Sequence, residues 1–207
     1  MTEPVAAPSG PPLALFDFDG TLTTADTMFA FVRHVVGGPR FALGMLWLAP
    51  GLLAHKLGLV PAHKAKTTLL RHFLGGRPAA ELEAAAARWS ATALPALLRP
   101  DGLRRLAALR AEGAELLLVS ASLDLWLRPF AEAQGMRLLC TVAEIDAEGR
   151  FTGGIASLNC NGDEKAARVR ASTALTGRAR IEAYGDTTGD AAMLGLADRA
   201  YYKPFRS

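Results

Sequence analysis

Two aspartates separated by a single residue follow directly on a short apolar run. Residues 13–16 read Leu-Ala-Leu-Phe and continue into Asp17, Phe18, Asp19 and Gly20. An unbroken apolar run is typical of a strand buried on both faces of a parallel sheet, and ligands bind beyond the carboxyl ends of such strands. Two carboxylates held this close repel each other unless a cation or a proton lies between them. We therefore expect an α/β fold with both carboxylates at the mouth of a sheet, with an Asp-Gly turn before a helix as the alternative.

The same arrangement, an apolar run that ends in polar residues, occurs twice more. Residues 115–119 are apolar after the first residue, Glu115, and end in Ser-Ala-Ser at 120–122. The weaker run 180–184 ends in Gly-Asp-Thr-Thr-Gly-Asp at 185–190, and a helix is predicted over 161–176. Because parallel strands end at the same edge of a sheet, these polar groups are expected to converge on one crevice.

The residue types in this crevice predict phosphoryl-transfer chemistry. Asp17, Asp19 and Asp186 offer the hard oxygen ligands that suit Mg²⁺. Lys165 is a cation that can bind a phosphate oxygen and offset the carboxylates. Ser120 adds a hydroxyl beside backbone N–H groups that form an anion site. A carboxylate nucleophile, a metal, a hydroxyl and an ammonium group together indicate transfer through an aspartyl-phosphate.

These segments resemble the four ordered motifs of the haloacid dehalogenase superfamily. The matching residues are Asp-Phe-Asp-Gly-Thr-Leu-Thr from Asp17, then Ser120, Lys165, and Gly-Asp-Thr-Thr-Gly-Asp ending at Asp190. The resemblance spans about residues 13–205 and implies a Rossmann-like core with a parallel central sheet and an inserted α-helical cap of the C1 type. Dehalogenases lack the second aspartate and transport ATPases need much longer chains, so the resemblance favours a phosphatase.

The resemblance also implies a role for each motif residue. Asp17 is expected to be the nucleophile and Asp19 the general acid/base. The cofactor is expected to be Mg²⁺, held by Asp17, the backbone carbonyl of Asp19, and Asp186, with Asp190 in support. The phosphate-binding residues are expected to be Ser120, Lys165, Gly20 and Ala121. The function that follows is hydrolysis of a small phosphorylated metabolite through an aspartyl-phosphate.

The chain is expected to consist of one catalytic core with a single insertion. Residues 1–12 are rich in Pro and Ala, which predicts a disordered tail. The catalytic core is expected to consist of residues 13–23 and 99–207, and the helical cap of residues 24–98. Within the cap, the pattern predicts helices over 26–36, 41–56, 61–74 and 78–97, separated by Gly- and Pro-containing breaks. Asp146 to Gly149 predicts the turn of a β-hairpin.

One part of the predicted cap is unusually apolar. Residues 41–54 carry no charge, and the apolar composition continues past Lys56 to residue 60. This run is shorter than the ~20 residues of a membrane-spanning helix. Two interpretations stay open: a helix buried within the cap, and an interfacial segment that gives residues 41–60 a peripheral membrane contact.

The substrate is less well determined by the sequence. Phosphoserine phosphatases place a Glu nine positions beyond the nucleophile, where this chain has Asp26, which would equally suit a helix N-cap. Residues 119–122, 159–165 and 202–205 resemble subfamily IB, which includes membrane-associated phosphatidylglycerophosphate phosphatases. A lipid phosphatase is therefore the alternative to a soluble-metabolite phosphatase, followed by a phosphoserine phosphatase or a phosphotransferase. A non-catalytic binding protein is not expected, because every motif residue is present.

Composition and charge limit the other classes of partner. The formal net charge is +3 and the charged fraction is 21%, with no basic-aromatic stripe of the kind that binds nucleic acid. Two cysteines without CxxC spacing predict reduced thiols and a cytoplasmic protein. If the apolar segment contacts lipid, the protein is expected to be membrane-associated as well. Basic residues of the predicted cap are further substrate-binding candidates, although each alone fits a solvated helix face: His34, Arg40, His55, Lys56, His63, Lys64, Lys66, Arg71 and His72.

Overall fold

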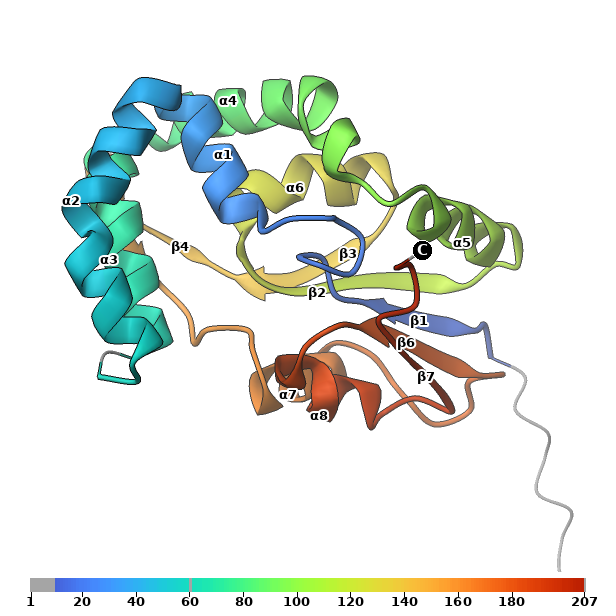
Figure 1. Ribbon diagram of the computed structural model, residues 1–207. Helices are drawn as coiled ribbons and strands as arrows, with labels where there is room; N and C mark the ends of the chain where they lie inside the picture. The colour runs from blue at the N-terminus through green and yellow to red at the C-terminus, as the bar shows by residue number, and fades with distance from the viewer. Residues whose placement is uncertain (1–9, 60, 207) are drawn as a thin grey trace, which may run out of the picture.

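The architecture is organised by a five-stranded parallel sheet (Figure 1). The computed structural model describes residues 10–59 and 61–206, apart from the side chains of His55 and Ala62. The sheet has the order β3-β2-β1-β6-β7. Its strands are β1 (Leu13–Phe16), β2 (Glu115–Leu123), β3 (Arg137–Thr141), β6 (Ile181–Gly185) and β7 (Arg199–Tyr202). The expected α/β fold with a parallel central sheet is confirmed.

Helices cover both faces of the sheet because both faces of its central strand are apolar. Ala14 and Phe16 of β1 face one hydrophobic core, which is shared with α5 (Pro100–Ala111) and α6 (Asp124–Ala133). Leu13 and Leu15 face a second core, which contains residues of α7 (Asp163–Ser172) and α8 (Ala191–Leu194). This alternation has the two-residue period of a strand. Figure 1 shows α7 and α8 on one side of the sheet and α5 and α6 on the other.

A run of helices lies between β1 and α5, in the region that the sequence predicted to be helical. They are α1 (Thr27–Val36), α2 (Gly38–Lys56), α3 (Ala62–Leu74), α4 (Ala79–Thr92) and the short 3₁₀ helix η1 (Leu94–Leu97). The second helix begins at Gly38 rather than at residue 41, because Pro39 suits a helix first turn. The predicted 78–97 helix is divided at Ala93, just before Pro95, whose missing N–H cannot continue the α-helical pattern.

Three further expectations need correction. The strand predicted to end at residue 119 continues to Leu123, so that Ser120 and Ser122 lie within β2. The helix predicted to run through residue 176 ends at Ser172, where Thr173 takes an extended conformation. Residues 1–9 of the predicted tail lie outside the described part, but Gly10 forms a parallel bridge with Arg178.

Two observations bear on compartment and membrane. Cys140 and Cys160 are both free and buried. Among the residues that the structure describes, no helix combines the length and the apolar character needed to cross a bilayer.

The predicted hairpin is formed by β4 (Ala143–Ile145) and β5 (Phe151–Ile155) and holds the helical insertion in place. The Gly76 N–H donates to the carbonyl of Phe151 at 2.7 Å, and the Phe151 N–H donates to the carbonyl of Arg77 at 2.9 Å. At Gly153 the backbone has a φ of +85°, and a Cβ there would lie 2.3 Å from the Cα of Arg71 in α3. The hairpin and α3 therefore approach so closely that only glycine fits between them.

We predict that Gly153→Ala strongly destabilises the protein. The substitution introduces both an unfavourable positive φ and a backbone clash with α3. The control is Gly149→Ala in the same hairpin, where φ is +74° but nothing lies within 4 Å of the added Cβ. Gly149→Ala should cost about 1–2 kcal/mol in the free energy of unfolding, and Gly153→Ala clearly more, as measured by urea denaturation. If both substitutions lowered the free energy of unfolding by the same amount, α3 would have moved to accommodate the added Cβ without strain, which would contradict the prediction.

Candidate active site

The carboxyl ends of three neighbouring strands form a polar pocket of about 300 Å³. Because β1 lies between β2 and β6, the pocket occupies the point where the strand order reverses, which is where open α/β sheets bind ligands. Its lining includes the predicted residues Asp17, Asp19, Asp26, Ser120, Ala121, Lys165 and Asp190. It also includes residues to which the motifs assigned no role: Met28, His63, Lys66, Ser122, Asn159, Asn161 and Thr187.

Lys165 joins two buried carboxylates at the base of the pocket. Its Nζ lies 2.6 Å from Asp17 Oδ1 and 2.6 Å from Asp190 Oδ1, and its side chain is 2% exposed. Burial raises the pKa of Asp17 to about 7, with the charge of Lys165 opposing the rise and that of Asp190 adding to it. Burial alone would lower the pKa of Lys165, but Asp17 and Asp190 raise it above its usual value. The ammonium group is therefore held charged beside Asp17.

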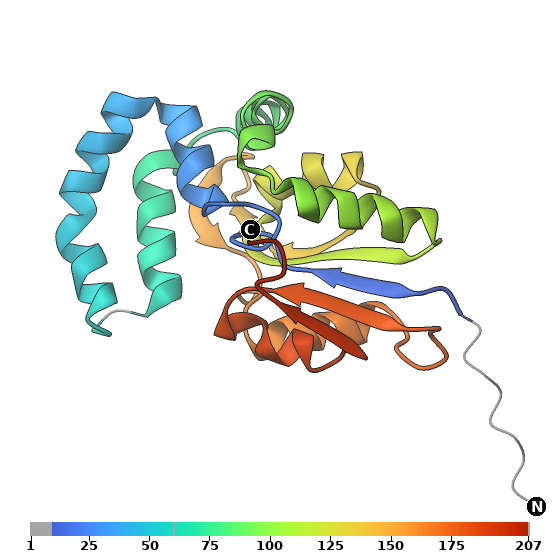
Figure 2. The same ribbon diagram turned by 45° about the vertical axis from the view of Figure 1, so that its right-hand side comes forward.

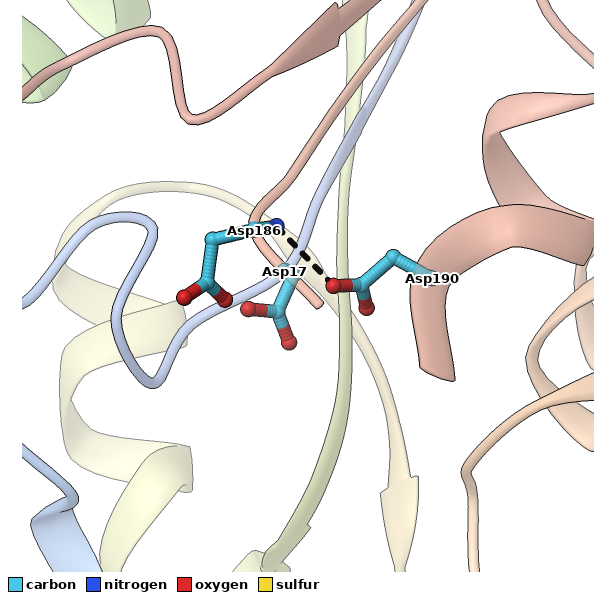
Figure 3. Close-up of side chains that lie close together, drawn as sticks. All are labelled: Asp17, Asp186 and Asp190. Atoms are coloured by element: carbon cyan, nitrogen blue, oxygen red, sulfur yellow. Dashed lines mark hydrogen bonds between the residues drawn. The ribbon is translucent and has the colours of Figure 1, made fainter. Parts of the chain in front are cut away.

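Asp186 completes a cluster of three buried carboxylates with Asp17 and Asp190 (Figure 3). One oxygen from each of the three lies within 4.8 Å of the others. Asp190 is fixed by backbone donors, because its Oδ2 accepts from the N–H groups of Asp186 at 3.0 Å and Thr187 at 2.9 Å. Burial alone would raise the pKa of Asp190, but Lys165 and these backbone donors hold it below its usual range.

Gly20 is required where the first motif turns past this cluster. Its φ is +83°, and a Cβ at that position would lie 2.4 Å from Asp186 Oδ2. The glycine of the first motif thus permits the close approach of the β1 loop to the β6 loop. Thr21 then donates from its hydroxyl to Asp17 Oδ2 at 2.9 Å.

Asp19 lies on the other side of the pocket and bridges two elements. Its Oδ1 accepts from the backbone N–H of Thr27, at the start of α1, at 2.6 Å. Its Oδ2 accepts from the hydroxyl of Ser122 in β2 at 2.6 Å. Ser122 was not predicted as a site residue, although it belongs to the same Ser-Ala-Ser strand end as Ser120, and both residues line the pocket.

Asp26 is both the N-cap of α1 and part of the pocket wall. Its Oδ1 accepts from the Met28 N–H at 2.9 Å, as the N-cap interpretation of the sequence proposed. Burial raises its pKa to about 6, and the charge of Asp19 adds to the rise. Its two predicted roles therefore do not exclude each other.

The helical insertion supplies one cation that reaches into the pocket. Lys66 of α3 donates from Nζ to the backbone carbonyl of Ala121 and lies 3.4 Å from Asn159 Oδ1. Burial lowers its pKa, against the charges of Asp19 and Asp26. Of the basic candidates in the insertion, only Lys66 and His63 line this pocket among the residues described. The side chain of His55 lies outside that part.

The charges around the pocket do not balance. Five carboxylates, Asp17, Asp19, Asp26, Asp186 and Asp190, meet the cations Lys66, Lys165 and Arg206, the last of which pairs with Asp186. The described side chains thus leave an excess of two negative charges if all are ionised. Three oxygen donors within reach of one another and this excess charge fit a hard divalent cation such as Mg²⁺.

Comparisons with known proteins place this site in a family. The sequence matches the model of the haloacid dehalogenase-like hydrolases over residues 14–195. It is 40% identical over 197 residues to protein CicA of Caulobacter vibrioides (strain NA1000 / CB15N), a match that covers 95% of this chain and 87% of CicA.

Solved structures share the fold at lower identity. A protein of unknown function from Bordetella pertussis Tohama I superimposes with a TM-score of 0.80 at 24% identity, covering 93% of this chain and 89% of that one. A substrate-bound phosphoserine phosphatase gives a TM-score of 0.63 at 16% identity, covering 94% and 86%. The family match over most of the chain, supported by this shared fold, leads to one conclusion: the chain belongs to the haloacid dehalogenase-like hydrolase family.

Proposed function

We propose that the protein is a Mg²⁺-dependent phosphomonoester hydrolase that acts on a small phosphorylated metabolite through an aspartyl-phosphate. The observation that carries this proposal is the geometry around Asp17, a buried carboxylate held by Lys165 at 2.6 Å at the base of a polar pocket. A carboxylate fixed in this way is positioned to attack a phosphorus atom and form a covalent intermediate.

Lys165 and Thr21 orient the proposed nucleophile. Lys165 engages Asp17 Oδ1 and Thr21 donates to Asp17 Oδ2. Because both are hydrogen-bond donors, they favour the ionised carboxylate, which is the nucleophilic form. Lys165 is also placed to bind a phosphoryl oxygen, together with the hydroxyl of Ser120 and the backbone at Ala121 and Gly20.

Asp19 is the proposed general acid/base. In the first half-reaction it protonates the leaving-group oxygen as the phosphoryl group moves to Asp17. In the second half-reaction it removes a proton from the attacking water, which releases phosphate and restores Asp17. The Ser122 hydroxyl and the Thr27 N–H keep this carboxyl group at the pocket wall, and its bond to Thr27 couples it to the first turn of α1.

The carboxylate cluster is the proposed Mg²⁺ site. Asp17, Asp186 and the backbone carbonyl of Asp19 would hold the ion, with Asp190 in support. The bound ion would offset the negative charge of the cluster and of the substrate phosphate. Both oxygens of Asp190 are already engaged, one by Lys165 and the other by backbone N–H groups. Asp190 is therefore better placed to orient Lys165 than to bind the ion directly.

The helical insertion is proposed to act as a cap. Met28 of α1 and both His63 and Lys66 of α3 contribute to the pocket wall, so substrate bound against Asp17 would also touch the insertion. Such a cap excludes bulk water from the reacting groups. The modest volume and the polar lining favour a small substrate with its own charged groups.

Asp26 and Lys66 are the proposed specificity residues. A carboxylate and an ammonium group on the same wall would suit a substrate with complementary charges. An amino-acid phosphate such as phosphoserine is one such compound, and a lipid phosphate remains the alternative substrate. Both alternatives use the same reaction at Asp17, as would a phosphotransferase that replaces water by an acceptor alcohol.

The metal site can be tested by stability rather than by activity. Mg²⁺ at a concentration ~100-fold above its Kd should raise the free energy of unfolding by about 2.7 kcal/mol. Asp186→Asn should abolish this increase, because it removes one charged ligand. Asp101→Asn is the control, since Asp101 pairs with Arg104 on the exposed surface of α5. Thermal denaturation with and without Mg²⁺ gives the comparison, and Mg²⁺ stabilisation of Asp186→Asn equal to that of the wild type would refute the assignment.

The function itself is tested by phosphate release over a panel of substrates. The panel contains phosphoserine, sugar phosphates, nucleotides and phosphatidylglycerophosphate in detergent, each assayed with and without Mg²⁺. We expect Mg²⁺-dependent hydrolysis of a soluble compound, and a loss of at least ~10³-fold in Asp17→Asn, as when a nucleophile is removed. Asp101→Asn again serves as the control. Undiminished hydrolysis by Asp17→Asn would overturn the mechanism, and preference for the lipid would overturn the proposed substrate class.

A further inference from the structure

The outer side of α2 is apolar from Ala42 to Leu53. Leu43, Leu46, Trp47 and Leu53 are between 58% and 77% exposed, and Leu57 and Leu59 continue the exposed apolar residues beyond the helix end. These six side chains are called the α2 surface below. From Ala42 to Leu53, the other exposed positions of the helix are Ala42, Ala49, Pro50 and Gly51, none of which has a polar side chain, and the first exposed charge after them is Lys56. A surface helix normally presents polar residues to water.

The α2 surface cannot be hidden by rotation of the helix, because its opposite side is fixed against α3. Gly44 is buried, and a Cβ there would lie 2.4 Å from the ring of Phe73. Leu48 and Leu52 also face α3 across a narrow apolar cleft that includes Leu69. Figures 1 and 2 both show α2 at the outer edge of the molecule, with α3 beside it.

The sequence segment that contains the α2 surface carries charges of one sign. Residues 27–80 contain seven Lys and Arg residues and no Asp or Glu, so this segment has a net charge of +7. The whole chain carries only +3, which leaves the remaining residues at −4. Arg40 in the first turn of α2 and Lys56 at its last residue are exposed, as is Lys64 in α3. Arg40 therefore precedes the exposed leucines, and Lys56 lies between Leu53 and Leu57.

We propose that the α2 surface docks onto an anionic lipid bilayer, with the α2 axis lying along the membrane interface. The uncharged exposed stretch from Ala42 to Leu53 extends ~18 Å along the helix axis in this orientation. Leucines enter the boundary between headgroups and acyl chains, Trp47 suits that depth, and the neighbouring cations meet lipid phosphates. The proposal does not depend on the proposed phosphatase activity.

A second copy of the chain is a poorer occupant of the same surface. Two molecules that met through α2 would bring two +7 segments together. Residues 27–80 themselves provide no carboxylate to offset the repulsion, and the neighbouring Glu81 already pairs with Arg77. An anionic bilayer covers the same leucines and gains attraction from the same cations.

The test measures binding of the full chain to vesicles of two compositions: phosphatidylcholine alone, and phosphatidylcholine with about one third phosphatidylglycerol. Trp47 is the reporter, because Trp89 and Trp126 are buried and give a constant background. We expect co-sedimentation with the anionic vesicles, weakened by salt, and a blue shift of the Trp47 emission. We also expect the protein to bind only weakly to vesicles of phosphatidylcholine alone.

Matched variants separate the two contributions to binding. Leu46→Ser should reduce the partition coefficient about tenfold, whereas Leu158→Ser, at a leucine that is equally exposed outside the insertion, should leave it unchanged. The double variant Arg40→Glu/Lys56→Glu should weaken binding at least ~tenfold, and Arg170→Glu on α7 should have little effect. Circular dichroism establishes that each variant is folded.

Three outcomes would overturn the proposal. The first is that folded wild-type protein binds neither vesicle. The second is equal binding to both vesicles without any effect of the charge reversals. The third is a concentration-dependent dimer, detected by sedimentation, that Leu46→Ser dissociates, because the surface would then be covered by a second copy. Since phosphate release from soluble substrates is measured separately, failure here is distinguishable from failure of the proposed function.

Discussion

The site depends on the placement of one ammonium group among buried carboxylates. Removing Asp17 and Asp190 from water is unfavourable, and Lys165 makes their burial tolerable by lying 2.6 Å from each. The three residues come from different elements, since Asp17 follows β1, Asp190 ends a 3₁₀ turn after β6, and Lys165 is in the first turn of α7. The ion pairs therefore tie together three segments that are distant in sequence.

The arrangement of the sheet explains why these segments meet. β1 pairs with β2 on one side and β6 on the other, so the loops after them share one edge. Glycine at position 20 then lets the first loop pass within contact distance of Asp186. The helical insertion enters the site through a few residues only, chiefly Lys66 of α3 and the first turn of α1. No described residue of α2 lines the pocket.

Much of the core could be predicted because its signals are local. The apolar run at 13–16, the Asp-x-Asp-Gly pattern and the placement of Lys165 at a helix start each follow from a few adjacent residues. The convergence of Asp17, Asp19, Ser120, Lys165, Asp186 and Asp190 on one edge followed from parallel strands alone, and the structure places them together.

The contributions of the insertion could not be predicted because they depend on tertiary contacts. Nothing in the sequence separates Lys66 from Lys64, two residues away on the same helix. In the structure, α3 packs against the β4–β5 hairpin, Lys66 donates to the carbonyl of Ala121, and Lys64 is exposed. Ser122 was overlooked because β2 was expected to end earlier. The sequence also did not decide whether the apolar segment 41–60 is buried or exposed. In the structure Leu46 and Trp47 are exposed, and residue 60 lies outside the described part.

The central claim is that the Asp17 carboxylate accepts the phosphoryl group, and its most direct test is to locate that group. The Asp19→Asn variant, in which release of phosphate is expected to be slowed, is mixed with a reactive phosphomonoester and Mg²⁺, quenched in acid, and digested for peptide mass spectrometry. The account predicts a hydroxylamine-labile phosphoryl group on the peptide that contains Asp17, and none when Asp17 is also replaced by Asn. A phosphoryl group on another residue would contradict the account.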